Sequence, residues 1–281
     1  MTSSTSTATR PSSRALDASA VNDLAGRLRG RVFAPNAPGY DEARTIWNAM
    51  IDKRPAIIAR CAGAADVRHA VRFAQDQGLV IAVRGGGHNI AGSALIDGGL
   101  VIDLSAMKSV RVDPAQRTAT VEPGVTLAEF DHDVQAFGLA TPVGINSTTG
   151  IAGLTLGGGF GWLSRTYGMT VDNLRSADVV TVSGELVKAN DRENQDLFWA
   201  LRGGGGNFGI VTAFEFGLHP VGPEVMAGLI VHPFADAGAL LRRYRDVAAA
   251  APNELAAWVV LRKAPPLPFL PADVHGKEVV V

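Results

Sequence analysis

Three clusters of glycine constrain this chain more than any other feature of its sequence. Of its 32 glycines, 19 fall in the windows 85–99, 144–168 and 203–209. Glycine accepts positive φ angles and lets a ligand approach the backbone closely, and consecutive N–H groups in such turns form a concave anion site. Each window adjoins an expected strand or helix end, so the three together predict a site for an extended ligand that carries phosphate. The alternative is that all three are ordinary turns of a strand-rich protein.

The overall composition is that of a globular protein with ample apolar surface for a core. The chain has 281 residues, of which 47% are hydrophobic, and this length predicts one large domain or two ordinary ones. Its net charge of −1 lacks the basic excess of a nucleic-acid binder, so we expect no nucleic-acid partner. The six histidines show no metal-ligand spacing, so we expect no metal site. Cys61, the single cysteine, is interpreted as a small buried apolar residue.

The first 38 residues are expected to form a disordered or loosely ordered N-terminal arm. Their Ser/Thr-rich beginning lacks the apolar run of a secretory signal. No later segment reaches 18 apolar residues without a charge or a glycine cluster. We therefore expect a soluble, cytoplasmic protein with no membrane partner.

Apolar residues with helical spacing predict a helix over 41–51 that begins at Asp41 as N-cap. The residues that would share one face of this helix are Ala43, Ile46, Trp47, Met50 and Ile51.

A strand–helix–strand unit leads into the first glycine window. It consists of a strand over 56–60, a helix over 66–77 that Gly78 ends, and an apolar strand over 79–83. Such a unit crosses over right-handedly and pairs its strands in parallel.

Further patterns predict strands and short helices along the rest of the chain. In chain order these are strands over 100–104, 109–113 and 118–122, a helix that begins with the capping box of Thr126 and Glu129 and that Gly138 closes, a hairpin of 174–182 and 185–189, a helix over 196–201, a strand over 210–218, a helix over about 236–250 and a strand over about 255–262. Residues 278–281 form a strand-like tail with nothing after it to pair with or to cover it.

Two nucleotide-binding motifs can be set aside. Gly204–Gly209 fits G-x-G-x-x-G, but that motif needs a strand before it and a helix after it, and here the order is reversed. Gly157–Gly161 lacks the Lys-Ser/Thr of a P-loop. The sequence therefore supports neither a nicotinamide-dependent dehydrogenase nor a nucleotide triphosphatase.

His88 is the most informative single residue. It ends a loop, RGGGH, that directly follows an apolar strand, so a ligand in the loop would meet its ring. A lone histidine is usually a surface or hydrogen-bonded loop residue. The three preceding glycines and Asn89 favour ligand chemistry instead.

Four longer motifs follow one another between Tyr40 and Pro220. They read VRGGGHNIAGSAL, VIDLSAM, STTGIAGLTLGGGFGWLSRTYGMTVDNL and LFWALRGGGGNFGIVTAFEF. In this order they resemble the FAD-linked oxidases of the vanillyl-alcohol oxidase type, and most of all the berberine-bridge-enzyme-like branch. The resemblance covers roughly two-thirds of the chain.

The resemblance implies that FAD lies between a small mixed subdomain and a larger one. The loop Arg84–Asn89 would cradle the pyrophosphate, and a ring nitrogen of His88 would be joined to the 8α-methyl group of the flavin, a bond that needs a neutral imidazole. Such a bond raises the flavin's reduction potential and favours hydride acceptance. The implied cofactor-binding residues are Arg84, Gly85, Gly86, Gly87, His88, Asn89, Gly92, Thr148, Thr149, Gly150, Gly153, Gly157, Gly158, Gly159 and Gly161, together with Ile210 and Val211 on the strand that borders the adenosine.

The chain departs from the family pattern at a second attachment point. Many members of the branch bind the flavin through an additional cysteine, and that position falls on Asn146 here. We therefore expect FAD to be covalently bound through His88 only. Thr149 matches the position that governs oxygen access in the family, but its side chain does not decide between an oxidase and a dehydrogenase.

The chain also departs from the family in length. Members of the family continue with a large antiparallel substrate domain and a return segment that frequently carries a tyrosine base, whereas this chain ends about 60 residues after Pro220. None of Tyr40, Tyr167 and Tyr244 matches that tyrosine, so the catalytic residues and the substrate stay unknown.

These observations predict an α+β chain with three parts. The arm of residues 1–38 precedes a PCMH-type FAD-binding fold of two mixed α/β subdomains over 39–222. Residues 223–281 would be the start of an antiparallel substrate domain.

Two functions remain open. The first is an FAD-dependent oxidoreductase that takes hydride from a C–H bond next to a hydroxyl or amine and is reoxidised by oxygen, so that its partners are a small-molecule substrate and oxygen. The alternative is a truncated flavin-binding remnant or partner-dependent module, motivated by the unpaired apolar tail Glu278–Val281. The oligomeric state is open.

Overall fold

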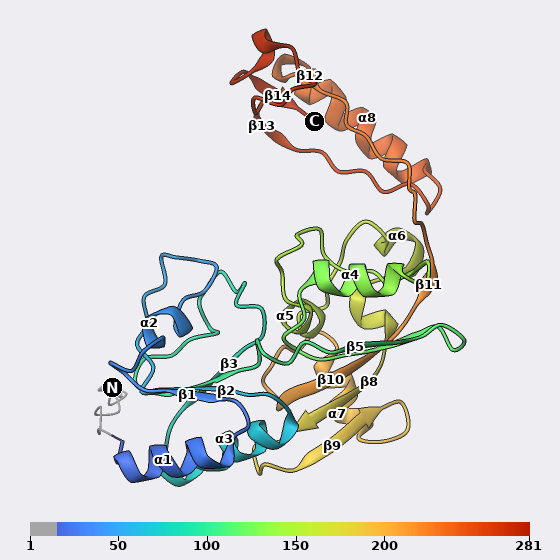
Figure 1. The fold of residues 1–281 in the computed structure, drawn as a ribbon. Coiled ribbons are helices and arrows are strands. Elements are labelled where there is room, and N and C mark those ends of the chain that lie inside the picture. Colours follow the sequence, from blue (N-terminus) through green and yellow to red (C-terminus); the bar gives the residue numbers. More distant parts are fainter. Residues whose placement is uncertain (1–15) are drawn as a thin grey trace, which may run out of the picture.

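A mixed four-stranded sheet forms the first part of the fold in this computed structural model, which describes residues 16–281 (Figure 1). In spatial order its strands are β1 (Arg31–Phe33), β2 (Ile57–Arg60), β4 (Leu100–Asp103) and β3 (Ile81–Arg84). β2 and β3 both run parallel to β4, and β1 pairs antiparallel with β2. The predicted strand–helix–strand unit is confirmed, but β4 lies between its two strands.

Helix α3 (Ala64–Gln77) connects β2 to β3 and packs its apolar face on the sheet. Val67, Ala70 and Ala74 are buried there beside Cys61, which confirms that this cysteine belongs to the core. Burial raises the pKa of the Cys61 thiol well above its ordinary value. Gly78 ends the helix with a φ of +65°, as the sequence predicts.

A five-stranded antiparallel sheet forms the second part. Its strands, in spatial order, are β5 (Val110–Asp113), β6 (Thr118–Val121), β10 (Ile210–Gly217), β8 (Leu174–Val180) and β9 (Leu186–Asn190). The predicted β8–β9 hairpin is confirmed. Phe214 and Phe216 of β10 are fully buried and pack in one cluster with Phe130 of the helix over 127–135, so one core joins this sheet to its helices.

Short helices cover the second sheet (Figure 1). They are α4 (Leu127–Gln135), α5 (Ile151–Leu156), α6 (Ser164–Tyr167), α7 (Gln195–Leu201) and the 3₁₀ turn Thr170–Asn173. The capping box that opens α4 is confirmed, because the Glu129 carboxylate accepts a hydrogen bond from the Thr126 N–H at 2.7 Å.

The N-terminal arm is more ordered than predicted. Residues 18–33, which we expected in a disordered or loosely ordered arm, form helix α1 (Ala18–Arg27) and strand β1. The Asp66 carboxylate accepts hydrogen bonds from the backbone N–H groups of Arg29, Gly30 and Ala62, and this fixes the arm to α3. The prediction was wrong for this part because these contacts are distant in sequence; the first 15 residues of the arm lie outside the described residues.

The predicted helix over 41–51 is also wrong. Only Tyr40–Ala43 are helical (α2), and Asp41 lies in the first turn while Gly39 takes the N-cap position. The Arg84 guanidinium donates hydrogen bonds to the carbonyl oxygens of Ala43 and Thr45, which removes these acceptors from a continuing helix. Met50, predicted on the buried face, is 90% exposed.

The C-terminal segment leaves the second sheet through β11 (His219–Pro220), which pairs with β7 (Leu139–Ala140). Figure 1 shows it continuing into a separate lobe (orange to red). The lobe consists of β12 (His232–Pro233), α8 (Ala237–Ala250), β13 (Leu261–Lys263), β14 (Glu278–Val280) and the 3₁₀ turns Phe234–Asp236 and Ala272–Val274.

Two predictions for this lobe need correction. The strand expected over 255–262 is observed only over Leu261–Lys263, next to Val260, which exchanges two backbone hydrogen bonds with Val281. The tail at 278–281 is not unpaired: β14 lies between β12 and β13 and pairs antiparallel with both. Val279 and Val280 are buried, since partners from 232–233 and 261–263 enclose them.

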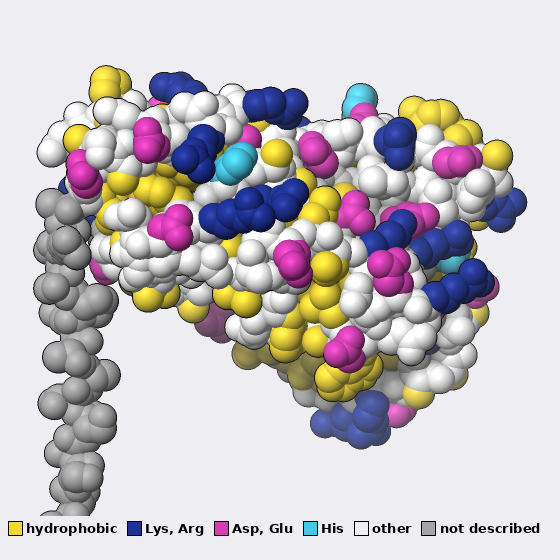
Figure 2. All heavy atoms as spheres, turned by 90° about the horizontal axis from the view of Figure 1, so that it is seen from below, with side chains coloured by type: hydrophobic (Ala, Val, Ile, Leu, Met, Phe, Trp, Pro, Cys, Tyr) yellow, Lys and Arg dark blue, Asp and Glu magenta, His cyan; other side chains and the backbone are white. Residues whose placement is uncertain are grey.

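Charged side chains of both signs are interspersed on the face shown in Figure 2. This distribution agrees with the net charge of −1. Within residues 16–281, no helix is long and apolar enough to cross a membrane.

Candidate functional site

The loop that follows β3 presents a row of free backbone donors. The N–H groups of five consecutive residues, Gly85 to Asn89, donate no hydrogen bond to any other group within the described part of the chain. Gly87 is buried and has a φ of +68°, a conformation that glycine adopts without strain. Consecutive unpaired N–H groups form an anion-binding concavity that needs no basic side chain.

A second glycine loop lies directly against the first. A Cβ atom added to Gly86 would lie 2.5 Å from the Cα of Gly150 and 2.6 Å from its nitrogen, so the two backbones are in contact. The second loop is fixed to the start of α4, since Leu127 donates to the Thr149 carbonyl oxygen and Ile151 donates to that of Val125, each at 2.9 Å. The loop that follows β3 of the first sheet therefore meets the loop that connects β7 to α5.

His88 lies at the junction of the two loops. Its Nε2 is 3.3 Å from the hydroxyl oxygen of Thr148. The Asn146 carboxamide oxygen accepts hydrogen bonds from the N–H and the hydroxyl of Thr148, which fixes that residue. Within residues 16–281, Nδ1 of His88 makes no hydrogen bond. Asn146, at the family's cysteine position, thus serves the loop as a hydrogen-bond acceptor.

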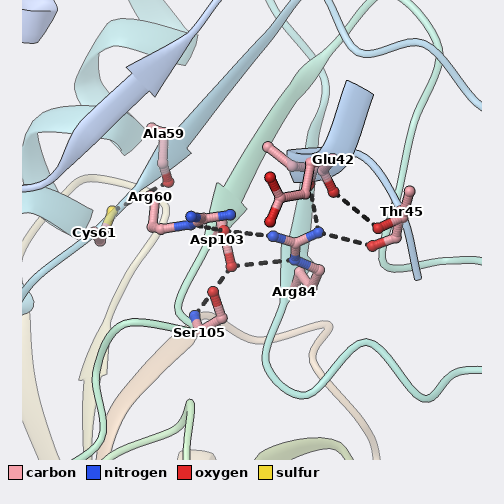
Figure 3. Close-up of polar contacts among 9 residues, drawn as sticks. Glu42, Thr45, Ala59, Arg60, Cys61, Arg84, Asp103 and Ser105 are labelled. Carbon is pink, nitrogen blue, oxygen red and sulfur yellow. Dashed lines mark hydrogen bonds and ion pairs between the residues drawn. The ribbon is translucent and has the colours of Figure 1, made fainter. Parts of the chain in front are cut away.

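The side chain of Arg84 is committed to the interior. Figure 3 shows its guanidinium paired with Asp103, which is fully buried and also accepts a 2.7 Å hydrogen bond from Arg60. Burial alone would raise the pKa of Asp103, but the hydrogen bonds and charges of Arg84 and Arg60 outweigh it and hold that pKa below its ordinary value. Arg84 therefore anchors the loop and does not offer its charge to a ligand.

The glycines around α5 divide into two groups. Gly153 has open space at its Cα, as a ligand-facing position would. A Cβ on Gly159 would meet Thr170, and one on Gly161 would meet the Val143 carbonyl oxygen, so both are needed for close packing of the chain itself. Gly157 ends α5, and Gly158 has a φ of +107°.

The third glycine window joins the same region. The N–H of Gly205 donates to the carbonyl oxygen of Leu156, the last residue of α5, at 2.9 Å. Ile210 and Val211, which follow this window, are buried at the start of β10. The three windows thus form one continuous series of contacts along α5.

The turn after His88 is held by its own residues. The Asn89 side chain accepts from the Ser93 N–H at 3.0 Å, and Gly92 has a φ of +70°. Lys53 donates to the Gly92 carbonyl oxygen at 2.8 Å, so its charge also stabilises the protein chain.

Sequence reasoning missed the segment Ile46–Asn48. The indole of Trp47 stacks on the imidazole of His88, with ring centroids 4.5 Å apart. The helical spacing of residues 43–51 assigned Trp47 to a helix face. No local pattern reveals a stack between residues 41 positions apart.

Two of the three tyrosine hydroxyls donate to backbone carbonyl oxygens, and the third tyrosine stacks on a histidine. The buried Tyr40 hydroxyl donates to the Pro55 carbonyl oxygen at 2.6 Å, and burial raises its pKa. The Tyr244 hydroxyl donates to the Ala257 carbonyl oxygen. Tyr167 stacks on His219. The catalytic residues therefore stay unknown.

The fold and the meeting glycine loops are those of an α+β FAD-binding domain, and the chain is similar to FAD-linked oxidoreductases and to proteins of the berberine-bridge-enzyme-like branch. Residues 55–190 match the FAD binding domain family. (R)-6-hydroxynicotine oxidase of Paenarthrobacter nicotinovorans is 41% identical to this chain over 203 residues, which are 72% of this chain and 44% of that protein.

Two solved structures are also similar. BBE-like 1 of Physcomitrella patens has 34% identity and a TM-score of 0.68, covering 71% of this chain and 44% of its own. A Phl p 4 variant described as a glucose dehydrogenase has 29% identity and a TM-score of 0.81, covering 93% of this chain and 54% of its own. The chain thus spans about half the length of the relatives it matches.

Proposed function

We propose that this chain is the flavin-binding part of an FAD-dependent oxidoreductase that takes hydride from a C–H bond next to a hydroxyl or amine, with oxygen as the final acceptor. The observation that supports the proposal is the contact between the loop after β3 and the loop before α5, beside five N–H groups that donate no hydrogen bond within residues 16–281. An extended ligand with a diphosphate fits such a set of donors. FAD, when bound, would supply the hydride-accepting ring.

The residues proposed to hold FAD are those predicted from the sequence, with one refinement. Gly85 to Asn89 would bind the pyrophosphate through backbone N–H groups. Arg84 would hold this loop in place, because its guanidinium pairs with Asp103 in the interior. Thr148 to Gly153 would contact the flavin from the other side, and Ile210 and Val211 would border the adenosine. The domain boundary at 222 belongs to the same proposal, whereas the boundary expected at 38 is not kept, because β1 pairs with β2 of the first sheet.

We further propose that FAD is covalently bound through His88 alone. The free Nδ1 and the fixed Nε2 of this residue support a bond from Nδ1. The bond would join that nitrogen to the 8α carbon, with loss of one 8α hydrogen and the imidazole hydrogen. The two electrons released would be taken up by oxygen, the oxidant named above, through the bound flavin.

The argument from the C-terminal tail for the competing proposal, a remnant or partner-dependent module, no longer holds. That proposal depended on an unpaired tail, and β14 pairs on both sides. Relatives described as an oxidase and as a dehydrogenase both match this chain, so the use of oxygen stays part of the proposal.

The absorption spectrum of the purified chain, before and after acid precipitation, tests the proposal. We expect a yellow protein after reconstitution with FAD, and colour that stays in the precipitate. A panel of hydroxyl- and amine-bearing compounds would then be added without oxygen to look for bleaching. A chain that retains no flavin would contradict the whole proposal, and retained flavin that no compound bleaches would contradict its catalytic part.

Alanine at Gly86 is expected to weaken FAD binding tenfold or more. Its Cβ would overlap the Gly150 backbone and push the loops apart, and overpacking of this kind costs about 1–3 kcal/mol. Titration of apoprotein with FAD measures the effect. Gly206→Ala is the control, because nothing lies within 4 Å of the added atom. Equal affinity in a correctly folded Gly86→Ala variant would show that the contact is irrelevant to binding.

A further inference from the structure

We propose that Trp47 is a positioning residue that holds the imidazole plane of His88 for its bond to the flavin. The inference rests on the proposed covalent attachment and assigns a role to a residue outside the three glycine windows. The indole and the imidazole are stacked, with centroids 4.5 Å apart and planes inclined by 24°.

The backbone of Trp47 is tied to the loop that carries His88. Its N–H donates to the Gly87 carbonyl oxygen at 3.1 Å. The neighbouring Asn48 carboxamide donates to the Ile90 carbonyl oxygen at 2.8 Å, on the other side of the histidine. The indole is therefore placed by hydrogen bonds that flank His88 on both sides.

The same segment is anchored on its N-terminal side. Arg84 donates to the carbonyl oxygens of Ala43 and Thr45 and pairs with the buried Asp103 (Figure 3). Ile46 packs against the cluster of Phe33, Tyr40 and neighbouring apolar residues. Trp47 thus extends from a rigid support, although 56% of its own surface is exposed.

His88 needs such a support. It follows three glycines, which restrict the backbone least of all residues. Within residues 16–281 its ring makes one hydrogen bond, to Thr148, which fixes the position of Nε2 but leaves the ring free to rotate about that contact. Stacking on a fixed indole removes this rotation, and a misplaced reacting group slows a reaction steeply.

Trp47 acts through His88 and takes no part in the electron transfer. The attachment forms a C–N bond, and one 8α hydrogen and the imidazole hydrogen are lost. The two electrons would be taken up by oxygen through the bound flavin. Only the rate of bond formation should therefore depend on the indole.

The test compares Trp47→Leu, which keeps apolar bulk, with Trp47→Phe, which keeps an aromatic face. Apoprotein of the full chain is mixed with FAD in air, samples are acid-precipitated over time, and flavin in the pellet is measured. FAD affinity is measured separately in the same variants carrying His88→Ala. Trp199→Ala is the control, because Trp199 is 75% exposed on α7.

We expect the rate of covalent attachment to be about tenfold lower in Trp47→Leu, because the loss of one aromatic stacking contact has an effect of this size. The rate should be largely restored in Trp47→Phe. Affinity for FAD in the His88→Ala background should change less than twofold. Equal attachment rates in wild type and Trp47→Leu would overturn the proposal, as would a loss of affinity that matches the loss of rate. A wild type that attaches no flavin would instead overturn the proposed bond at His88, and the role of Trp47 with it.

Discussion

Alanine at His88 leaves no flavin in acid-precipitated protein, whereas the wild type keeps it; this is the expected result if the attachment is as proposed. The substitution removes the nitrogen that would form the bond, and Asn146 stands where a second attachment occurs in the family. The backbone N–H groups of Gly85 to Asn89 remain, so FAD should still bind non-covalently. Flavin fluorescence of the denatured protein band measures the covalent fraction.

The control for this experiment is His132→Ala. His132 is exposed on α4 and has no part in the proposed site, so its variant should retain flavin like the wild type. Fluorescence that survives in His88→Ala would place the bond at another residue. A wild type without bound fluorescence would show that FAD is held by non-covalent contacts alone.

Replacing Asp103 with leucine should destabilise the fold by about 3–5 kcal/mol, since it leaves the Arg84 guanidinium buried without its counter-charge. The loss should be smaller for Asp103→Asn, which keeps a hydrogen-bond acceptor. Denaturant unfolding of the full chain measures both. The matched control is Asp246→Asn, since Asp246 pairs with Arg245 at the exposed surface and exposed pairs contribute about 0–1 kcal/mol.

The Asp103 effect should depend on pH in a defined direction. The pKa of this carboxyl is lower in the fold than its ordinary value of about 3.9. A lowered carboxyl pKa contributes stability above the unfolded value, and that contribution is lost as pH falls through the folded value. The difference between wild type and Asp103→Leu should be constant from about pH 5 to 8 and shrink below about pH 4. A difference below 1 kcal/mol at neutral pH would contradict a buried charge pair.

Local patterns predicted the elements whose signals are local. The capping box of Thr126 and Glu129 and the stop at Gly78 depend on neighbouring residues, and both are confirmed. Strand β14 and the order of α1 depend on partners far along the chain, namely residues 232–233 and 261–263 for the strand and Asp66 for the arm. Composition alone could not reveal these contacts.

The candidate site also contains features that the sequence could predict and features that it could not. The glycine windows could be predicted because glycine marks close backbone approach in any sequence, and the structure brings Gly86 and Gly150 together. The role of Arg84 could not be predicted from the sequence. Its charge is directed inward because it pairs with Asp103, which is buried on a neighbouring strand. Trp47 was assigned to a helix face because its spacing fits one, while hydrogen bonds to the 87–90 loop hold it elsewhere.

The contact between Gly86 and Gly150 has a consequence for assembly. Gly86 lies in the loop after β3 of the four-stranded sheet, and Gly150 lies in the loop between β7 and α5, so the complete cradle forms only when both parts of the domain have folded. A ligand that binds only the joined state raises its stability in proportion to the logarithm of ligand concentration. FAD, when bound, would then stabilise the contact between the two parts of the domain, so that the stability of this chain would depend on the FAD concentration.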